Sequence, residues 1–230
     1  MFSNFDQAQA FVKQDGIRMV DLKFIDLWGR WHHVTISASE FTPSLMENGV
    51  GFDGSSVGFK SVRAGDMVLI PDLSTGFLDP FWETPTLSFI CNTMEADTKE
   101  LFSFDPREIA RRAEKHLIES GIADKSIWGP EFEFYVFNKV TFENGVNVSS
   151  YRVDSIESNW NSAQGGHGHF IPLHGGYHAI PPRDQLYNLR SEIVTTLEEI
   201  GLKIKYHHHE VGGPGQCEIE TPLLDIMSAG

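Results

Sequence analysis

The sequence predicts an α+β fold arranged in two domains. Two segments, 105–120 and 184–200, carry apolar residues at helical spacing. Shorter segments rich in β-branched and aromatic residues alternate between apolar and polar positions, as strands do. In the first hundred residues these strands include a hairpin, which favours a mostly antiparallel sheet. A chain of 230 residues is long enough for one or two domains with a buried core.

Composition limits the class of protein. Hydrophobic residues make up 40% and charged residues 22% of the chain, as is ordinary for a globular protein in water. The net charge of −14 argues against a nucleic-acid or anionic-membrane partner. Cys91 and Cys217 lie far apart and lack metal-site spacing, which suits a reducing compartment. Because no signal-peptide pattern and no membrane-length apolar run occurs, we expect a cytoplasmic protein.

The first domain is expected to span residues 1–100. Its elements in chain order are a helix at 4–14, strands at 17–27 and 30–36 joined by a turn, and strands at 67–70 and 87–92.

A Gly- and Ser-rich loop is predicted at 52–60. It contains the motif Asp53-Gly54-Ser55-Ser56. Either Asp53 caps a plain turn, or the loop has a chemical role. On its own the motif is weak, and the plain turn is favoured.

The second domain is expected to span residues 101–230, with its boundary near 98–104. It opens with the helix at 105–120, for which Asp105 is the predicted N-cap and Pro106 the first helical residue. The predicted inner stripe of this helix consists of Ile109, Ala113, His116 and Leu117. A strand at 128–137 and a hairpin at 140–148 with Asn144-Gly145 at its tip follow.

Residues 161–182 are predicted to form a long loop with a short strand at 177–180, because Gly and His dominate the segment. Its histidines suggest either a zinc site or contacts with substrate or solvent. The second alternative is favoured because no pair has zinc-site spacing with cysteine partners. The histidines are His167, His169, His174 and His178.

The end of the chain is predicted to contain a helix at 184–200, a strand at 202–206 and a strand at 217–220. The inward residues of the helix are expected to be Leu186, Leu189, Ile193 and Leu197.

Pairs of glutamates alternate along two of the predicted strands. Glu131 and Glu133 share one face of the first strand, and Glu218 and Glu220 share one face of the last. Such a pair either faces water on a half-exposed strand or holds a cation, because like charges this close repel. The alternation alone does not choose between Glu218 and Glu220 as ligands.

One sheet would bring Glu131, Glu133, Glu210 and Glu218 together. A set of oxygen ligands favours Mg²⁺ or Mn²⁺ over Zn²⁺. Two such ions would suit phosphoryl transfer from ATP, since metals neutralise the charge that develops on phosphate oxygens. The sequence contains neither a Walker A motif nor a kinase-type Gly-rich loop.

Five motifs occur in an order that resembles the bacterial type I glutamine synthetases. The resemblance covers essentially the whole chain and corresponds to the N-terminal half of the family. The motifs lie at 52–56, 66–72, 129–135, 175–182 and 207–218.

The resemblance implies a β-grasp-like N-terminal domain followed by the start of a glutamine synthetase catalytic domain with an antiparallel sheet and helices. The family assimilates nitrogen by joining ammonia to glutamate, with ATP as substrate and γ-glutamyl phosphate as intermediate. It uses two divalent metals, Mg²⁺ or Mn²⁺. By position, Glu133, Glu210 and Glu218 match ligands of the metal that organises glutamate, and Glu131 matches a ligand of the metal beside ATP.

The resemblance also assigns a role to the first domain. Asp53 matches the residue that binds ammonium and removes its proton, and Ser55 and Ser56 lie on the same loop. In the family a neighbouring subunit supplies this loop, so the active site is shared and the enzyme is a double-ring dodecamer.

Family members continue into motifs that this sequence does not contain, including further metal ligands and the arginines that hold glutamate. We therefore expect the 230 residues alone to lack biosynthetic activity. Two alternatives are a γ-glutamyl-amine ligase, which the retained Asp53 disfavours, and a non-catalytic truncated paralogue that binds full-length subunits.

Overall fold

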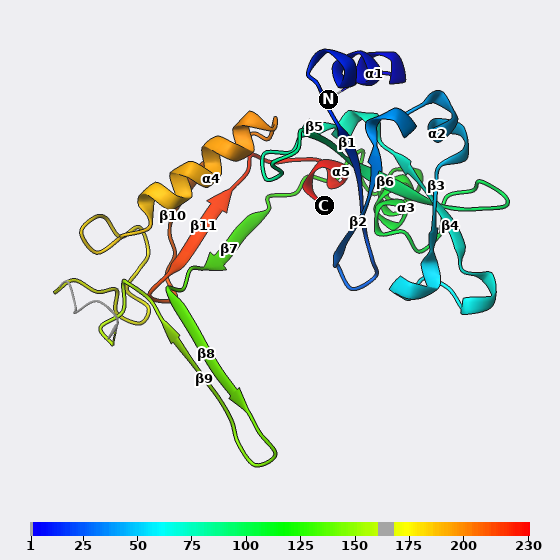
Figure 1. The fold of residues 1–230 in the computed structure, drawn as a ribbon. Coiled ribbons are helices and arrows are strands. Elements are labelled where there is room, and N and C mark those ends of the chain that lie inside the picture. The colour runs from blue at the N-terminus through cyan, green and yellow to red at the C-terminus, as the bar shows by residue number, and fades with distance from the viewer. Residues whose placement is uncertain (1, 161–167) are drawn as a thin grey trace. The chain divides into compact units, whose positions relative to one another are not determined.

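The computed structural model describes residues 2–160 and 168–230, and its contacts divide the chain into two compact units (Figure 1). Unit 1 comprises Met1–Ile127 and Asp225–Gly230, and unit 2 comprises Trp128–Leu224. The domain boundary near residue 100 stays a prediction. His167 of the predicted histidine-rich loop lies outside the described residues.

Unit 1 is built on a sheet whose strands are mostly antiparallel, as predicted. In the part of the chain that the structure describes, the strand order is β2-β1-β6-β4-β3, and β5 pairs with β6. The β1–β6 pair alone is parallel within this sheet. The strands are β1 (Met19–Ile25), β2 (Trp31–Ser37), β3 (Val50–Asp53), β4 (Asp66–Pro71), β5 (Phe77–Leu78) and β6 (Thr86–Glu95).

The hydrophobic core lies on one face of this sheet. Successive side chains of a strand point to opposite faces, so alternate residues of β1, β4 and β6 enter the core. Helices α1 (Phe5–Gln14) and α2 (Pro43–Asn48) add Ala8, Val12 and Leu45 to it. The Asn4 side chain accepts a hydrogen bond from the Gln7 backbone N–H and caps α1, which confirms the predicted first helix.

Helix α3 (Pro106–Glu119) begins as predicted, with Asp105 as its N-cap. Its inner face was predicted wrongly, because Ile109, Ala113 and His116 are exposed and Leu117 is only partly buried. Polar residues anchor the helix. Arg107 pairs with Asp72 at 2.6 Å, and Arg111 donates to the Asn92 side chain at 2.6 Å. These partners on the sheet decide which side of the amphipathic helix turns inward.

A buried polar cluster surrounds Asp21 on the face of β1 away from the core. Its carboxylate accepts hydrogen bonds from Lys23 at 2.7 Å and from Thr35 at 2.6 Å, and contacts His33 at 2.7 Å. Burial would raise the pKa of Asp21, but the hydrogen bonds from Lys23, Thr35 and His33 outweigh it and lower this pKa. The cluster therefore stabilises the fold while Asp21 is ionised.

Replacing Asp21 with Asn is expected to lower the free energy of unfolding at pH 7 by about 3 kcal/mol, because a buried ion pair loses one partner. Since the pKa of Asp21 is lower when folded, its contribution is complete above the ordinary value of 3.8. The contribution is lost as pH falls through the folded value, so the difference between variant and wild type should shrink below pH ~4. Urea unfolding at several pH values measures this, with Asp124→Asn as an exposed control. A difference that persists at the lowest pH would contradict it.

Unit 2 contains a three-stranded antiparallel sheet in the order β10-β11-β7, counted among the described residues. Helix α4 packs against β10 and β11 (Figure 1). The elements are β7 (Glu131–Tyr135), β10 (Tyr206–His209), β11 (Gln216–Glu220) and α4 (Tyr187–Glu199). The predicted strand at 202–206 is wrong, because the strand starts only at Tyr206 and includes the histidine run. Helix α4 begins later than predicted, since Asp184 turns inward to bind Arg190.

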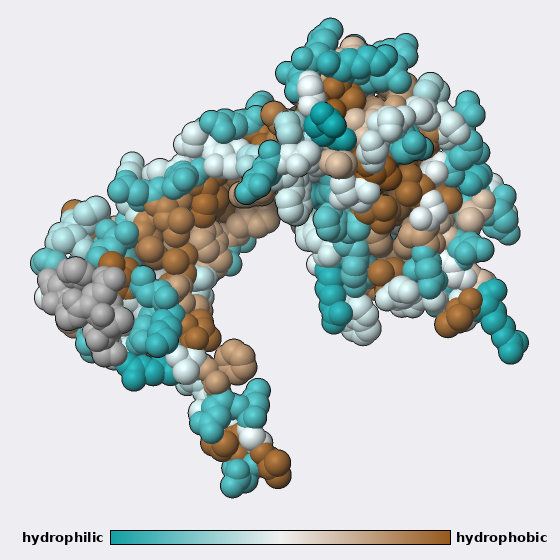
Figure 2. Space-filling model, viewed as in Figure 1, coloured by the Kyte–Doolittle hydropathy of each residue, from teal (hydrophilic) through white to brown (hydrophobic). Residues whose placement is uncertain are grey.

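A hairpin of β8 (Lys139–Asn144) and β9 (Ser149–Asp154) extends from unit 2. The predicted tip at Asn144-Gly145 is too early, because Asn144 pairs with Ser149 and the turn occupies 145–148. Hydrophobic side chains on the hairpin are exposed, as Figure 2 shows near its tip. They are Val140, Phe142, Val146, Val148 and Tyr151.

The remaining segments are turns and short helices. The strand predicted at 177–180 is wrong, because these residues turn, with the Ala179 N–H donating to the Gly176 carbonyl. Short helices occur at η1 (Ala38–Glu40), η2 (Gly54–Val57), η3 (Val62–Ala64), η4 (Leu73–Thr75) and α5 (Ile226–Ala229). Of the helices described, none has the length and hydropathy needed to cross a bilayer.

Candidate metal centre

One face of the unit 2 sheet is acidic. Strand alternation puts Glu131 and Glu133 on this face of β7, and Glu218 on the same face of neighbouring β11. The register places Glu218 between Glu133 on one side and His208 of β10 on the other. Phe132 and Ile219 point to the opposite face. The alternation found in the sequence is therefore preserved in three dimensions.

Glu218 is the centre of two groups of side chains that could bind a metal ion. The first is His208, Glu210 and Glu218, and the second is Glu131, Glu218 and Glu220. In each group the candidate ligand atoms lie within 4.8 Å of one another. The structure thus brings together three of the four glutamates proposed as ligands. Glu220 is a weaker candidate because its carboxylate pairs with Lys205 at 2.7 Å.

The electrostatics of this cluster favour a cation. Burial of Glu218 raises its pKa to about 7, and the neighbouring Glu210 and Glu131 add to the effect while His208 opposes it. One carboxylate oxygen of Glu210 is buried and has no hydrogen-bond partner among the described residues, although His208 Nδ1 lies 3.6 Å from it. A divalent ion would neutralise the carboxylates and give this oxygen a partner. The oxygen-rich donor set fits Mg²⁺ or Mn²⁺.

Glu133 lies outside both groups, although it is opposite Glu218 in the sheet. Its carboxylate accepts a hydrogen bond from the Gln216 side-chain N–H at 2.7 Å. The side-chain oxygen of Gln216 in turn accepts from the Gly212 backbone N–H. Gln216 therefore fixes the orientation of Glu133. Sequence reasoning did not identify Gln216 or His208 as neighbours of the carboxylates, although both obey the same strand alternation.

Two buried ion pairs lie on the other side of this sheet. Arg190 of α4 binds Asp184 through two hydrogen bonds of 3.1 and 2.7 Å. His209 contacts Glu157 at 2.8 Å, and both side chains are fully buried. Burial opposes protonation of His209, but the Glu157 hydrogen bond and charge outweigh it and raise the pKa of His209. Neither pair was predicted. His209 and Glu157 are 52 residues apart, and Asp184 was expected to begin the helix that contains Arg190.

In unit 1, Asp53 ends β3 and caps the short helix η2. Its carboxylate accepts from the Ser55 backbone N–H at 2.9 Å and from the Ser56 hydroxyl at 3.0 Å. Hydrogen bonds from Ser55, and then from Ser56, lower the pKa of Asp53, so the exposed carboxylate is ionised at neutral pH. Such a carboxylate can bind a cation and accept a proton. Its role in chemistry stays a prediction.

Gly65 leaves room for the capping position of Asp53. A Cβ atom at residue 65 would collide with the Asp53 carboxylate. The backbone of Gly65 is right-handed helical, with φ of −76°, so alanine fits the backbone itself.

The Gly65→Ala variant is therefore expected to displace the Asp53 carboxylate from Ser55 and Ser56 without unfolding unit 1. Because those hydrogen bonds lower the pKa of Asp53, the variant should raise this pKa toward its ordinary value. Carboxyl-carbon NMR over an acid titration measures the change. Gly51→Ala is the matched control, since a Cβ at Gly51 meets nothing. An unchanged Asp53 pKa in Gly65→Ala would contradict the expectation.

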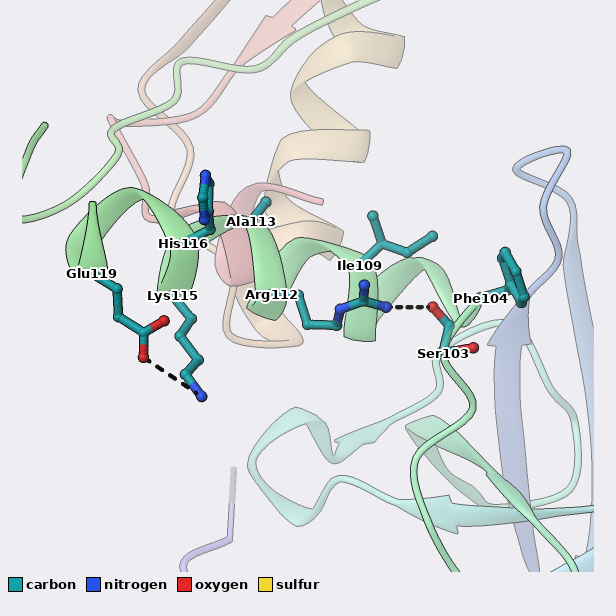
Figure 3. A pocket seen from close by; sticks show the side chains of 8 residues that line it. All are labelled: Ser103, Phe104, Ile109, Arg112, Ala113, Lys115, His116 and Glu119. Carbon is teal, nitrogen blue, oxygen red and sulfur yellow. Dashed lines mark hydrogen bonds and ion pairs between the residues drawn. The ribbon is translucent and has the colours of Figure 1, made fainter. Parts of the chain in front are cut away.

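A hollow of about 610 Å³ lies along α3 in unit 1 (Figure 3). Arg112 donates to the Ser103 carbonyl, and Lys115 pairs with Glu119, so its charged groups already have partners. The hollow contains no group of potential metal ligands among the described residues. The hollow lies along the side of α3 that was expected to be buried, and we propose no chemical role for it.

A sheet that gathers carboxylates and an imidazole around one buried glutamate defines a candidate divalent-metal protein. Residues 16–96 match the model of the glutamine synthetase β-grasp domain, and residues 103–230 match that of the glutamine synthetase catalytic domain. The chain belongs to the glutamine synthetase family. The predicted α+β fold, with a β-grasp domain followed by part of the catalytic domain, is confirmed.

The chain is similar along most of its length to individual proteins of more than one printed name. A glutamine synthetase of Methylococcus capsulatus is 43% identical over 90% of this chain and 45% of its own length. A 3-hydroxylaminophenol mutase of Cupriavidus pinatubonensis is 40% identical over 99% of this chain and 49% of its own length. A solved Plasmodium falciparum glutamine synthetase shares the fold, with a TM-score of 0.87 at 23% identity over 99% of this chain and 46% of that one. The chain thus spans about half the length of the relatives it matches.

Proposed function

We propose that these residues form part of a glutamine synthetase, which joins ammonia to glutamate in an ATP-dependent reaction through γ-glutamyl phosphate. The observation that carries the proposal is the carboxylate cluster around Glu218, in a chain whose two segments match both domains of the family. Such a cluster is costly to assemble unless cations neutralise it. Metal-assisted phosphoryl transfer uses that arrangement.

Each carboxylate has a proposed role. Glu133, Glu210 and Glu218 would hold the metal on the glutamate side, and Glu131 would contribute to the metal on the ATP side. When bound, these ions would neutralise charge on phosphate and carboxylate oxygens. Support comes from the buried oxygen of Glu210 that lacks a hydrogen bond among the described residues, and from the raised pKa of Glu218, to which the neighbouring carboxylates contribute.

Asp53 has a separate proposed role at the ammonia step. Ammonium must lose a proton before its nitrogen can attack a γ-glutamyl phosphate, and a positioned carboxylate is a suitable base. Ser55 and Ser56 hold the Asp53 carboxylate by hydrogen bonds and keep it ionised. We further propose that the loop acts in the site of a neighbouring subunit of a dodecamer, and that the protein works in the cytoplasm.

The test is to express the reading frame that contains these 230 residues and assay it with glutamate, ammonia, ATP and Mg²⁺ or Mn²⁺. Metal-dependent formation of glutamine and ADP is expected. An isolated 230-residue chain is expected to form none, because it lacks motifs that the family uses. Absence of glutamine formation by the complete product would overturn the proposal.

Alternative functions give different results in the same assay. Product from methylamine but not from ammonia would favour a γ-glutamyl-amine ligase. Since one 40% identical relative is a 3-hydroxylaminophenol mutase, conversion of that compound is a second control reaction. Co-purification with a full-length synthetase, without activity of its own, would favour a non-catalytic paralogue.

A further inference from the structure

Glu157 is a fully buried carboxylate that follows strand β9 and belongs to none of the groups described as metal ligands. Three N–H groups from distant parts of unit 2 contact it. One oxygen lies 2.8 Å from the His209 ring nitrogen Nε2 and accepts from the Gly215 backbone N–H at 2.8 Å. The other oxygen accepts from the Gln185 backbone N–H at 2.7 Å. A buried charge with three donors is held in one place.

His209 extends this contact toward the carboxylate cluster. Its second ring nitrogen, Nδ1, lies 2.8 Å from the backbone carbonyl oxygen of Glu210. Both ring nitrogens therefore face oxygen atoms, one on Glu157 and one on the backbone of Glu210, and these two contacts fix the orientation of the ring.

These hydrogen bonds connect His209 and Glu157 to the two ends of one turn, which residues 210–216 form. His209 holds the carbonyl of Glu210 at the start of the turn, and Glu157 holds the N–H of Gly215 near its end. The turn closes with the Glu210 N–H donating to the Gln216 carbonyl at 3.0 Å. Glu210 then directs its side chain to Glu218, while Gln216 directs its amide to Glu133. Two proposed ligands thus depend on the position of this turn.

We propose that Glu157 and His209 are positioning residues of the metal centre, which hold the 210–216 turn so that Glu210 and Glu133 present their carboxylates to the ion. The inference rests on the metal centre of the proposed function. Removing a residue that hydrogen-bonds to a metal ligand typically lowers the metal affinity by about 10- to 100-fold. A purely structural ion pair would instead change stability and leave affinity unaltered.

The Asp184–Arg190 pair is a matched control in the same unit. It is also buried and also lies on the far side of the sheet. Arg190 contacts His207 of β10 and Cys217 of β11 as well, but among the described residues the pair has no hydrogen bond to the 210–216 turn. Breaking either pair leaves a buried charge without its partner, so both changes should lower the melting temperature. Only the Glu157 substitution should also displace the proposed metal ligands.

The experiment measures Mn²⁺ binding to the 230-residue chain by electron paramagnetic resonance of the free ion. The variants are Glu157→Gln, Asp184→Asn and the double variant Glu157→Gln with His209→Gln. The double variant removes both charges and is expected to fold even where the single change does not, since no lone buried charge remains. We expect about 10- to 100-fold weaker binding in the single and double Glu157 variants. Asp184→Asn should bind like wild type despite its lower melting temperature.

Each result is decisive. Wild-type affinity in the folded Glu157 variants would overturn the inference, as would an equal loss of affinity in Asp184→Asn. Glu218→Gln reports on the metal centre separately. If Glu218→Gln loses Mn²⁺ and Glu157→Gln does not, the positioning inference fails while the metal centre stands. If wild type binds no Mn²⁺, the proposed metal centre fails.

Hydrogen exchange without metal provides a second measurement. The amides of Gly212 and Gly215 should exchange faster in the double variant than in wild type, because the turn has lost its anchors. They should keep wild-type rates in Asp184→Asn. Unchanged exchange in the double variant would overturn the inference whatever the metal results are.

Discussion

Replacing Glu218 with Gln is expected to weaken Mn²⁺ binding to the chain by about 100-fold or more, equivalent to ~2.8 kcal/mol at 1.4 kcal/mol per factor of ten. Glu218 belongs to both groups of candidate ligands, so its loss affects every metal position that the sheet offers among the described residues. The substitution keeps the size of the side chain and removes only its charge. Isothermal titration of the metal-free chain with Mn²⁺ measures the effect.

The same substitution should raise the stability of the metal-free protein. Glu218 is 7% exposed and lies beside Glu210 and Glu131, whose charges repel its own. Removing that repulsion favours the folded state. Opposite changes in affinity and melting temperature would therefore identify a site assembled for a cation. Glu143→Gln, on the exposed hairpin, removes the same charge and should alter neither quantity. Unchanged Mn²⁺ affinity in Glu218→Gln would exclude Glu218 as a ligand.

The acidic face could be predicted because strand alternation is local. Glu131 and Glu133 are two residues apart in one strand, so they share a face of the sheet whichever strands pair with theirs. Alternation also puts Gln216 on this face of its own strand, but the sequence did not show that its partner is Glu133, 83 residues away. The Glu157–His209 contact spans 52 residues. Ligand candidates were thus accessible from the sequence, whereas the residues that support them depend on the tertiary fold.

Helix α3 shows the same limit in the fold. Its length, Asp105 cap and amphipathic spacing are local and were predicted correctly. The direction in which it faces was not, because Arg107 and Arg111 find partners on the sheet 35 and 19 residues away. An apolar stripe predicts a helix with two unlike sides, but packing partners elsewhere in the chain select the buried side.

In the complete product of the reading frame, Asp53→Ala is expected to slow glutamine formation from ammonium by about 10²- to 10⁴-fold, the usual contribution of a general base. The step that slows should be the reaction of ammonia, since Asp53 is not one of the residues proposed to bind a metal. Hydroxylamine is largely unprotonated at neutral pH and needs no base to free its nitrogen. The variant should therefore keep most of its rate when hydroxylamine replaces ammonium.

The pH dependence separates this role from a loss of structure. As pH rises toward the pKa of ammonium, free ammonia becomes abundant and the need for a base disappears. The defect of Asp53→Ala should then shrink, whereas a collapsed η2 loop would leave it constant. Ser56→Ala is the control for the loop, because it removes one hydrogen bond to the carboxylate but keeps the base. An Asp53→Ala defect of equal size with both nucleophiles and at every pH would contradict the base assignment and leave Asp53 as the cap of η2.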